Sequence, residues 1–152
     1  MSESFRTKIM RWGFNLFPAY RRTGGRITYI SRDMKSVRVA VPLNWKTRNY
    51  VGTIFGGSMY GSVDPIYMIM FIKLLGPAYI VWDKAAVIRF KKPGRSTLTA
   101  EFTVAEEELT AVRRECEHGE PVNRIYTVDL VDRGNTVCAS IEKTLHFRKK
   151  IM

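Results

Sequence analysis

Residues 54–65 read IFGGSMYGSVDP and run directly into IYMIMFIKLLG, residues 66–76. The paired glycines followed by small and apolar residues predict a helix over about 57–75 that is buried on most of its circumference. A carboxylate and a proline, Asp64 and Pro65, stand in the middle of it. Proline removes a backbone hydrogen bond inside a helix, so we expect a kink that re-aims the Asp64 side chain.

The same residues have a second interpretation as an ordinary helix start. Asp is common at the N-cap and Pro at the first helical position, so the helix would begin at Pro65 and residues 56–63 would form a loop. In the first interpretation Asp64 lies seven residues after Gly57 and therefore on the same face of one helix. In the second it caps the backbone. The sequence leaves both open.

This apolar segment is too short to span a bilayer. A spanning helix needs about 20 predominantly apolar residues, whereas eight residues separate Asp64 from Lys73. Gly76 and Pro77 then end the segment. We expect a buried helix and no membrane partner.

The rest of the chain alternates between helical and strand patterns. The expected elements are an amphipathic helix over about 3–17, two strands within 27–43, the central helix, two strands within 79–104 joined at Pro93 and Gly94, a helix over 106–116 and a hairpin within 123–148. An antiparallel sheet beside one very apolar helix predicts an α+β fold in which the sheet curls around that helix. The length favours a single domain, residues 1–152.

The first helix carries two neighbouring apolar rows. Phe5, Ile9, Trp12 and Leu16 form one row, and the second consists of Met10, Phe14 and Phe17. Spacings of three and four residues are typical of a helix face, and Pro18 should end the helix. We expect it to lie across the core or against a partner.

Composition limits the partners and the compartment. The formal net charge of +11 attracts polyanions such as nucleic acid or a phosphorylated cofactor. Nucleic acid ranks last, because the basic residues are not interleaved with aromatic ones as in RNA-binding motifs. Cys116 and Cys138 form no disulfide or zinc pattern, and we expect reduced thiols and a cytoplasmic protein without a secretory signal.

One set of spacings resembles a known family. Asn49 stands six residues before Phe55, Phe55-Gly56-Gly57 opens the central helix, and Asp64 follows seven residues after Gly57. This pattern and the order of elements resemble the hotdog-fold acyl-CoA thioesterases, in particular the branch typified by phenylacetate-pathway thioesterases. That branch has His-Gly-Gly where this chain has Phe-Gly-Gly.

The resemblance implies a fold, an assembly and a reaction. The sheet would wrap the central helix, and two protomers would pair edge to edge as a homodimer or a dimer of dimers (homotetramer). Acyl-CoA would bind at their interface and be hydrolysed to the free acid and coenzyme A, with no metal and no cofactor beyond the coenzyme A of the substrate. Asp64 would act as general base or nucleophile, Gly57 N–H would polarise the thioester, and Asn49 would supply the polar contact.

Further residues are candidates for substrate binding. Phe55 and Gly56 adjoin the helix start, and Asp83 occupies a strand position where the resembling enzymes often carry a small hydroxyl. Asp83 is either a second acid of the site or a partner of Lys84 or Arg89. The coenzyme A phosphates would contact four basic residues around one turn, namely Arg89, Lys91, Lys92 and Arg95. The alternative for these is a solvated basic edge that discourages aggregation.

Phe55 favours a second function. Phenylalanine donates no hydrogen bond, so the resemblance is also compatible with a hotdog protein that binds an acyl-CoA or fatty-acyl group without turning it over.

Overall fold

The computed structural model describes residues 2–151. Its helices and strands, in chain order, are α1 (Phe5–Leu16), α2 (Pro18–Arg21), β1 (Arg26–Ile30), β2 (Ser36–Val41), α3 (Gly56–Val63), α4 (Ile66–Leu75), β3 (Tyr79–Phe90), β4 (Leu98–Thr103), α5 (Glu106–Glu115), β5 (Val122–Val131) and β6 (Val137–Lys149). The order of helices and strands matches the order expected from the sequence, apart from the short α2.

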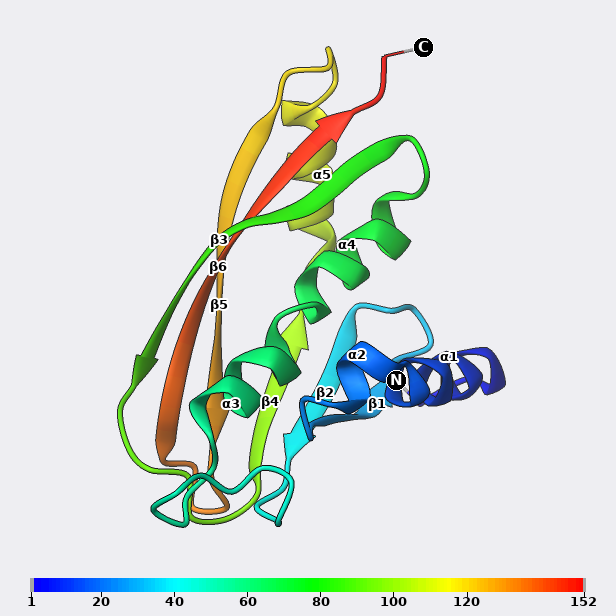
Figure 1. The fold of residues 1–152 in the computed structure, drawn as a ribbon. Coiled ribbons are helices and arrows are strands. Elements are labelled where there is room, and N and C mark those ends of the chain that lie inside the picture. The colour runs from blue at the N-terminus through cyan, green and yellow to red at the C-terminus, as the bar shows by residue number, and fades with distance from the viewer. Residues whose placement is uncertain (1, 152) are drawn as a thin grey trace.

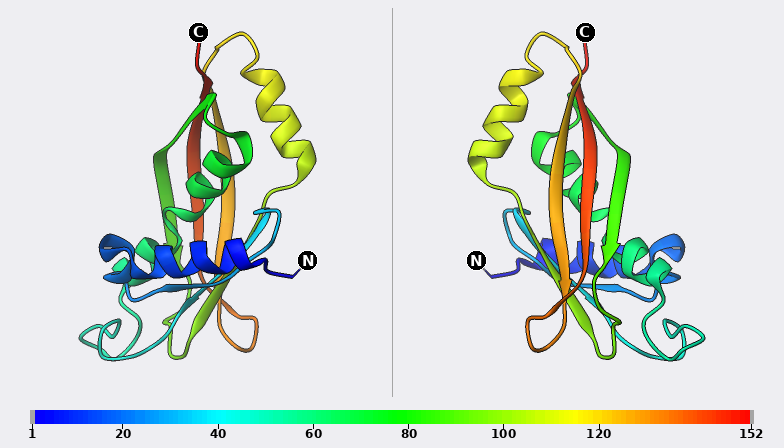
Figure 2. Two further views of the ribbon diagram at one scale, coloured as in Figure 1. Left: turned by 90° about the vertical axis from the view of Figure 1, so that its right-hand side faces the viewer. Right: turned by 90° about the vertical axis from the view of Figure 1, so that its left-hand side faces the viewer.

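The strands form one antiparallel sheet in the order β1-β2-β4-β5-β6-β3. The sheet is strongly curved, and α3 and α4 lie along its concave side (Figure 1). Seen from the opposite side, β3, β5 and β6 face the viewer with the helices behind them (right panel of Figure 2). A curved antiparallel sheet around a central helix is the expected α+β hotdog fold.

The central helix is broken where the sequence places Asp64 and Pro65. α3 ends with Asp64 as its C-cap, and α4 begins after Pro65, whose position has no side-chain cap hydrogen bond. Residues 56–63 are helical rather than a loop, so the N-cap interpretation of Asp64 is wrong. The kink expected from proline is a full break between two helices.

The expectation that β3 and β4 are joined at Pro93 and Gly94 as neighbouring strands is wrong. β3 pairs with β6 along 11 residue pairs, whereas β4 pairs with β2 and, at Thr99 opposite Val131, with β5. β6 has 13 residues, long enough to carry β5 on one side and β3 on the other. This arrangement places β3 at the free edge of the sheet.

The core lies between the sheet and the central helix. Phe71 of α4 stacks edge-on against Phe147 of β6, with ring centroids 4.9 Å apart, and Tyr67 meets Phe102 of β4 at the same distance. Burying such rings contributes roughly 2–3 kcal/mol each relative to leaving them exposed. The helix is therefore fixed along its length to the inner face of the sheet.

α1 is anchored to β1 by polar side chains. Glu3 accepts a hydrogen bond from the Ile30 amide at 2.9 Å, and the Asn15 side chain bonds both backbone groups of Ile27 at 2.7 and 2.8 Å. The second apolar row faces inward, with Met10 and Phe14 packed against the core. The helix therefore lies across the core, as one of the two expected arrangements has it, while the first row, Phe5, Ile9, Trp12 and Leu16, is 57–80% accessible.

No helix within residues 2–151 is long and apolar enough to cross a bilayer. Cys116 and Cys138 are free and buried, and burial raises the pKa of both thiols. The expected reduced state of these residues agrees with this placement.

Substitution of Gly25 tests the contact between the N-terminal segment and α3, and substitution of Gly13 is the control. A Cβ at Gly25 would overlap the side chain of Ser62, whereas a Cβ at Gly13 meets nothing within 4 Å. We expect Gly25→Ala to lower the free energy of unfolding by about 1–3 kcal/mol. Gly13→Ala should raise it by up to about 1 kcal/mol, because alanine is the better helix former. Urea denaturation of both variants measures this, and equal effects would contradict the packing described.

Candidate active site

The break in the central helix presents the Asp64 carboxylate to two donors. Its Oδ1 accepts a hydrogen bond from the Tyr60 hydroxyl at 2.7 Å and from the Lys143 ammonium at 2.5 Å. Within residues 2–151 nothing engages Oδ2, and the side chain is 39% exposed. Asp64 is thus held through one oxygen and keeps the other available.

Lys143 is the functional residue that the sequence reasoning missed. It is 1% exposed although it carries a charge, and it also contacts the Tyr60 hydroxyl at 3.3 Å. The sequence pattern of β6 could have identified Lys143, because every second residue of that strand points inward. Lys143 interrupts that buried series, whose other members are Ala139, Ile141, Leu145 and Phe147. A lysine in the inward register of a strand indicates a buried ionic partner.

Asp83 is the second carboxylate beside Lys143. Its Oδ1 lies 3.0 Å from the ammonium but is not aligned as a hydrogen bond, and this buried oxygen has no other partner among the described residues. Among the described residues Asp83 pairs with Lys143 and not with Lys84 or Arg89, so it belongs to the same charged cluster as Asp64.

The cluster shifts the titration of its members. Burial raises the pKa of Asp83, while the charge of Lys143 acts in the opposite direction. Burial lowers the pKa of Lys143, but its contacts with Asp64 and Asp83 outweigh this and the pKa lies above its ordinary value. Burial and the bond to Asp64 raise the pKa of Tyr60. Lys143 is therefore a firmly protonated cation between two carboxylates.

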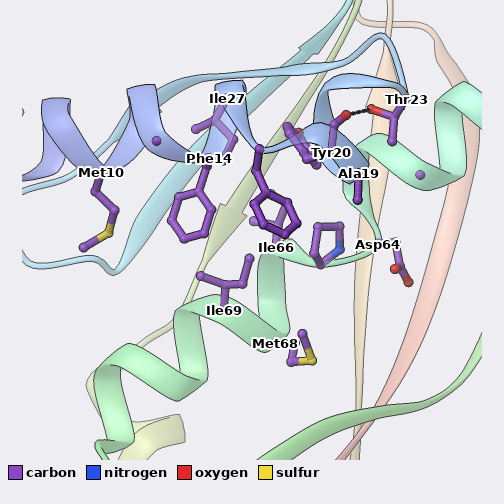
Figure 3. Close-up of a pocket in the computed structure, with 14 residues that line it drawn as sticks. Met10, Phe14, Ala19, Tyr20, Thr23, Ile27, Asp64, Ile66, Met68 and Ile69 are labelled. Carbon is purple, nitrogen blue, oxygen red and sulfur yellow. Dashed lines mark hydrogen bonds between the residues drawn. The ribbon is translucent and has the colours of Figure 1, made fainter.

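An apolar cavity of about 660 Å³ opens beside Asp64. It lies between the inner face of α1 and the start of α4, with Met10 and Asp64 at opposite ends (Figure 3). Its wall consists of Met10, Gly13, Phe14, Phe17, Ala19, Tyr20, Thr23, Ile27, Gly61, Asp64, Pro65, Ile66, Met68 and Ile69. Asp64 is the one charged residue in this wall.

The start of α3 differs from the open anion site expected from its glycines. The amide groups of Gly56 and Gly57 have no acceptor among the described residues, as at any helix start. However, the Phe55 ring occupies the space beside Gly57, and a Cβ at Gly56 would lie 2.9 Å from the Phe90 ring. Because Gly56 and Gly57 have no Cβ, the Phe90 and Phe55 rings can lie directly against the start of the helix. Both rings are more than half exposed, so solvent surrounds them.

Asn49 lies at this end of α3, in a loop that it stabilises. Its Oδ1 accepts from the amides of Val51 and Thr53 at 3.1 and 3.0 Å, and its Nδ2 donates to Thr53 Oγ1 at 2.9 Å. A second cavity, of about 450 Å³, brings together Asn49, Thr53, Ile54, Gly56, Met59, Phe90, Lys91, Lys92 and Pro93. Several of the expected site residues therefore share one cavity, but Asp64 is not among them.

The expected site is divided between the two ends of α3. Seven residues at 1.5 Å each separate Gly57 from Asp64 by about 10 Å along the helix. This separation is too large for the helix start and the acid of one chain to contact the same ligand atom, contrary to the expectation. One chain alone does not bring both groups to one thioester carbonyl.

The four basic residues of the expected phosphate site are exposed. Arg89 pairs with Glu142 at 2.8 Å, while Lys91, Lys92 and Arg95 make no ion pair within the described residues. Lys91 and Lys92 also border the second cavity. Across residues 2–151, no three His, Cys, Asp or Glu side chains gather in a way that would hold a metal ion.

A curved antiparallel sheet wrapped around a central helix defines the chain as a hotdog-fold protein (Figure 1). Residues 6–147 match the family described as "Domain of unknown function (DUF4442)", and the chain belongs to that family. No curated protein matches it in sequence.

Solved structures share the fold at low identity. A protein of unknown function and probable thioesterase from Pseudomonas aeruginosa superimposes with a TM-score of 0.85 at 18% identity, covering 99% of this chain and 100% of that one. A thioesterase from Haemophilus influenzae gives 0.71 at 15% identity over 99% and 96% of the two chains. The PaaI protein of the Escherichia coli phenylacetic acid degradation operon gives 0.64 at 15% identity over 92% and 91%.

The buried cation is open to a direct test. We expect Lys143→Met to lower the free energy of unfolding at pH 7 by about 3 kcal/mol, because it leaves two carboxylates without their cation. The loss should shrink toward pH 4, since burial raises the pKa of Asp83 and protonation of Asp83 relieves the repulsion between the two side chains. In the wild type the raised pKa of Lys143 keeps its contribution intact until the pH exceeds the ordinary lysine range.

Chemical denaturation at pH 4 and pH 7 measures both effects. Lys84→Met, at an exposed position of β3, is the matched control. A Lys143→Met variant as stable as that control, or equally impaired at both pH values, would contradict the buried ionic cluster.

Proposed function

We propose that the protein hydrolyses an acyl-CoA thioester to the free acid and coenzyme A. The observation that carries this proposal is Asp64, which is fixed by Tyr60 and Lys143 through one oxygen and borders an apolar cavity. An oriented carboxylate beside a space for an apolar group suits attack on an acyl compound. The thioesterase-like structural neighbours support the same class.

Asp64 acts on the thioester through its unengaged Oδ2. As a general base it takes a proton from a water molecule, whose oxygen attacks the thioester carbonyl. The tetrahedral intermediate then collapses, the C–S bond breaks, and the coenzyme A sulfur leaves as a thiolate that takes up a proton. As a nucleophile Asp64 would instead form a mixed anhydride, which water then cleaves. Tyr60 and Lys143 are positioning residues in either route.

The oxyanion is stabilised by the amides of Gly56 and Gly57 at the start of α3, but from a second protomer. Backbone amides at a helix start stabilise developing negative charge. Asp64 is linked through Lys143 to Asp83, and Gly56 lies beside Phe90. Antiparallel pairing of two β3 strands centred between residues 86 and 87 would set Asp83 opposite the partner's Phe90, and so bring Asp64 toward the partner's helix start.

β3 has the properties of such an interface. It pairs only with β6 and leaves its other edge free. Ile80, Trp82, Val87 and Phe90 are 37–58% exposed along it. A long exposed apolar edge strand is a site for pairing with another chain. A homodimer, or a dimer of such dimers, in the cytoplasm completes the proposal.

Asn49 keeps the loop before α3 in place and contributes its remaining amide N–H to the second cavity. Phe55 stands where a hydrogen-bond donor is expected and covers Gly57. This observation favours the second candidate function, a protein that binds acyl-CoA without hydrolysis. Under the hydrolase proposal the exposed Phe55 ring moves aside when the thioester binds.

Turnover distinguishes the two functions. Release of free thiol from a panel of acyl-CoAs is expected for the wild type, and Asp64→Asn should lower kcat by at least about 100-fold, because an amide cannot accept the proton. Asn retains an oxygen for the bonds from Tyr60 and Lys143, so the melting temperature should stay within a few degrees. Thermal stabilisation by acyl-CoA without thiol release in the wild type would refute hydrolysis and support the binding function.

The unpaired basic residues are expected to bind the coenzyme A phosphates. Lys91→Ala combined with Lys92→Ala should raise KM for acyl-CoA several-fold and leave KM for the matching acyl-pantetheine, which lacks the nucleotide, unchanged. Arg133→Ala, in the exposed β5–β6 turn, is the control. Equal effects on both substrates would place the nucleotide elsewhere.

A further inference from the structure

We propose that the cavity under α1 holds an unbranched aliphatic acyl chain of about eight carbons or more, with its thioester at the Asp64 end. The inference rests on the proposed function for the position of the thioester. It assigns the substrate class from the wall of the cavity itself (Figure 3).

The polar groups of the wall leave one point of contact for a ligand. The Tyr20 hydroxyl donates to the Ser62 carbonyl at 2.8 Å, and the Thr23 hydroxyl donates to the Tyr20 carbonyl at 2.7 Å. Both are satisfied within the chain, whereas Asp64 Oδ2 is not. No basic residue lines the cavity, so it does not suit a phosphate or a free carboxylate. Its occupant is therefore apolar along its length and polar at the end next to Asp64.

The dimensions favour a chain over a short or compact acyl group. A cavity of about 660 Å³ falls within the usual range for small-molecule sites. Its wall follows α1 from Phe17 to Met10, which is about 10 Å at 1.5 Å per residue. An extended chain advances about 1.2 Å per bond, so about eight bonds cover that distance. An acetyl or a benzoyl group would leave much of the cavity empty.

The lining can adapt to a chain. Met10 of α1 and Met68 of α4 lie toward opposite ends of the cavity wall (Figure 3), and methionine side chains adjust to irregular apolar surfaces. The Asp64 carboxylate at its end of the cavity repels another carboxylate and accepts a neutral thioester. The cavity should therefore bind the substrate more tightly than the fatty acid anion that hydrolysis releases.

Binding of non-hydrolysable S-alkyl-CoA thioethers tests this without relying on turnover. We expect the affinity, measured by isothermal titration calorimetry, to rise about four-fold per methylene up to about eight carbons and then to level off. Ile69→Trp, which fills the cavity, should weaken octyl-CoA binding at least ten-fold with little effect on ethyl-CoA. Ile72→Trp lies on the exposed side of the same helix and should leave both unchanged.

A second cavity variant, Gly13→Leu, keeps the test valid if Ile69→Trp does not fold. A Cβ at Gly13 meets no neighbour within 4 Å, so the Gly13→Leu side chain starts from open space at the edge of the cavity and should also select against long chains. Ile9→Leu, on the outer face of α1, is its control. Affinity that does not depend on chain length, or Gly13→Leu and Ile69→Trp that both bind octyl-CoA like their controls, would overturn the proposal.

The outcomes separate this inference from the proposed function. Chain-length-dependent binding without thiol release from any acyl-CoA would refute hydrolysis and retain the acyl cavity. Thiol release at equal efficiency from acetyl-CoA and octanoyl-CoA, without the binding trend, would retain hydrolysis and refute the cavity.

Discussion

The ion pair between Lys143 and Asp64 links the fold to the chemistry. A lysine that is 1% exposed on the inner face of a sheet is costly unless a carboxylate meets it. The break at Pro65 supplies that carboxylate, because the last turn of α3 ends where β6 carries its ammonium. The irregularity in the central helix and the buried charge in the strand therefore depend on each other. From β3, Asp83 adds a second carboxylate beside the same ammonium.

The two ends of α3 offer complementary groups. One end presents an oriented carboxylate beside an apolar cavity, and the other presents free backbone amides beside a basic turn. A thioester of coenzyme A has the matching parts, an apolar chain, a polarisable carbonyl and an anionic nucleotide. Because about 10 Å of helix separates the ends, we infer that two protomers, paired through the exposed edge of β3, bring them together.

Much of the fold was predictable from periodicity, and the reasons for the failures are physical. Alternating strands and the apolar run after Pro65 identified the elements, but strand order depends on contacts distant in sequence, which local patterns do not contain. The turn at Pro93 and Gly94 therefore suggested a false β3–β4 pairing. Lys143 was overlooked although its place in the inward register of β6 was visible. The sequence left open which apolar row of α1 is covered, because helical spacing does not reveal which of two apolar faces meets the core.

A structure with a bound ketone analogue of octanoyl-CoA, in which a methylene replaces the thioester sulfur, tests the central claim most directly. The account predicts the alkyl chain under α1, the carbonyl within hydrogen-bond distance of a water held by Asp64 Oδ2 or of that oxygen itself, and the partner subunit's helix start on the other side of the carbonyl. An analogue bound elsewhere, with the cavity under α1 empty and Asp64 in contact only with Tyr60 and Lys143, would contradict it.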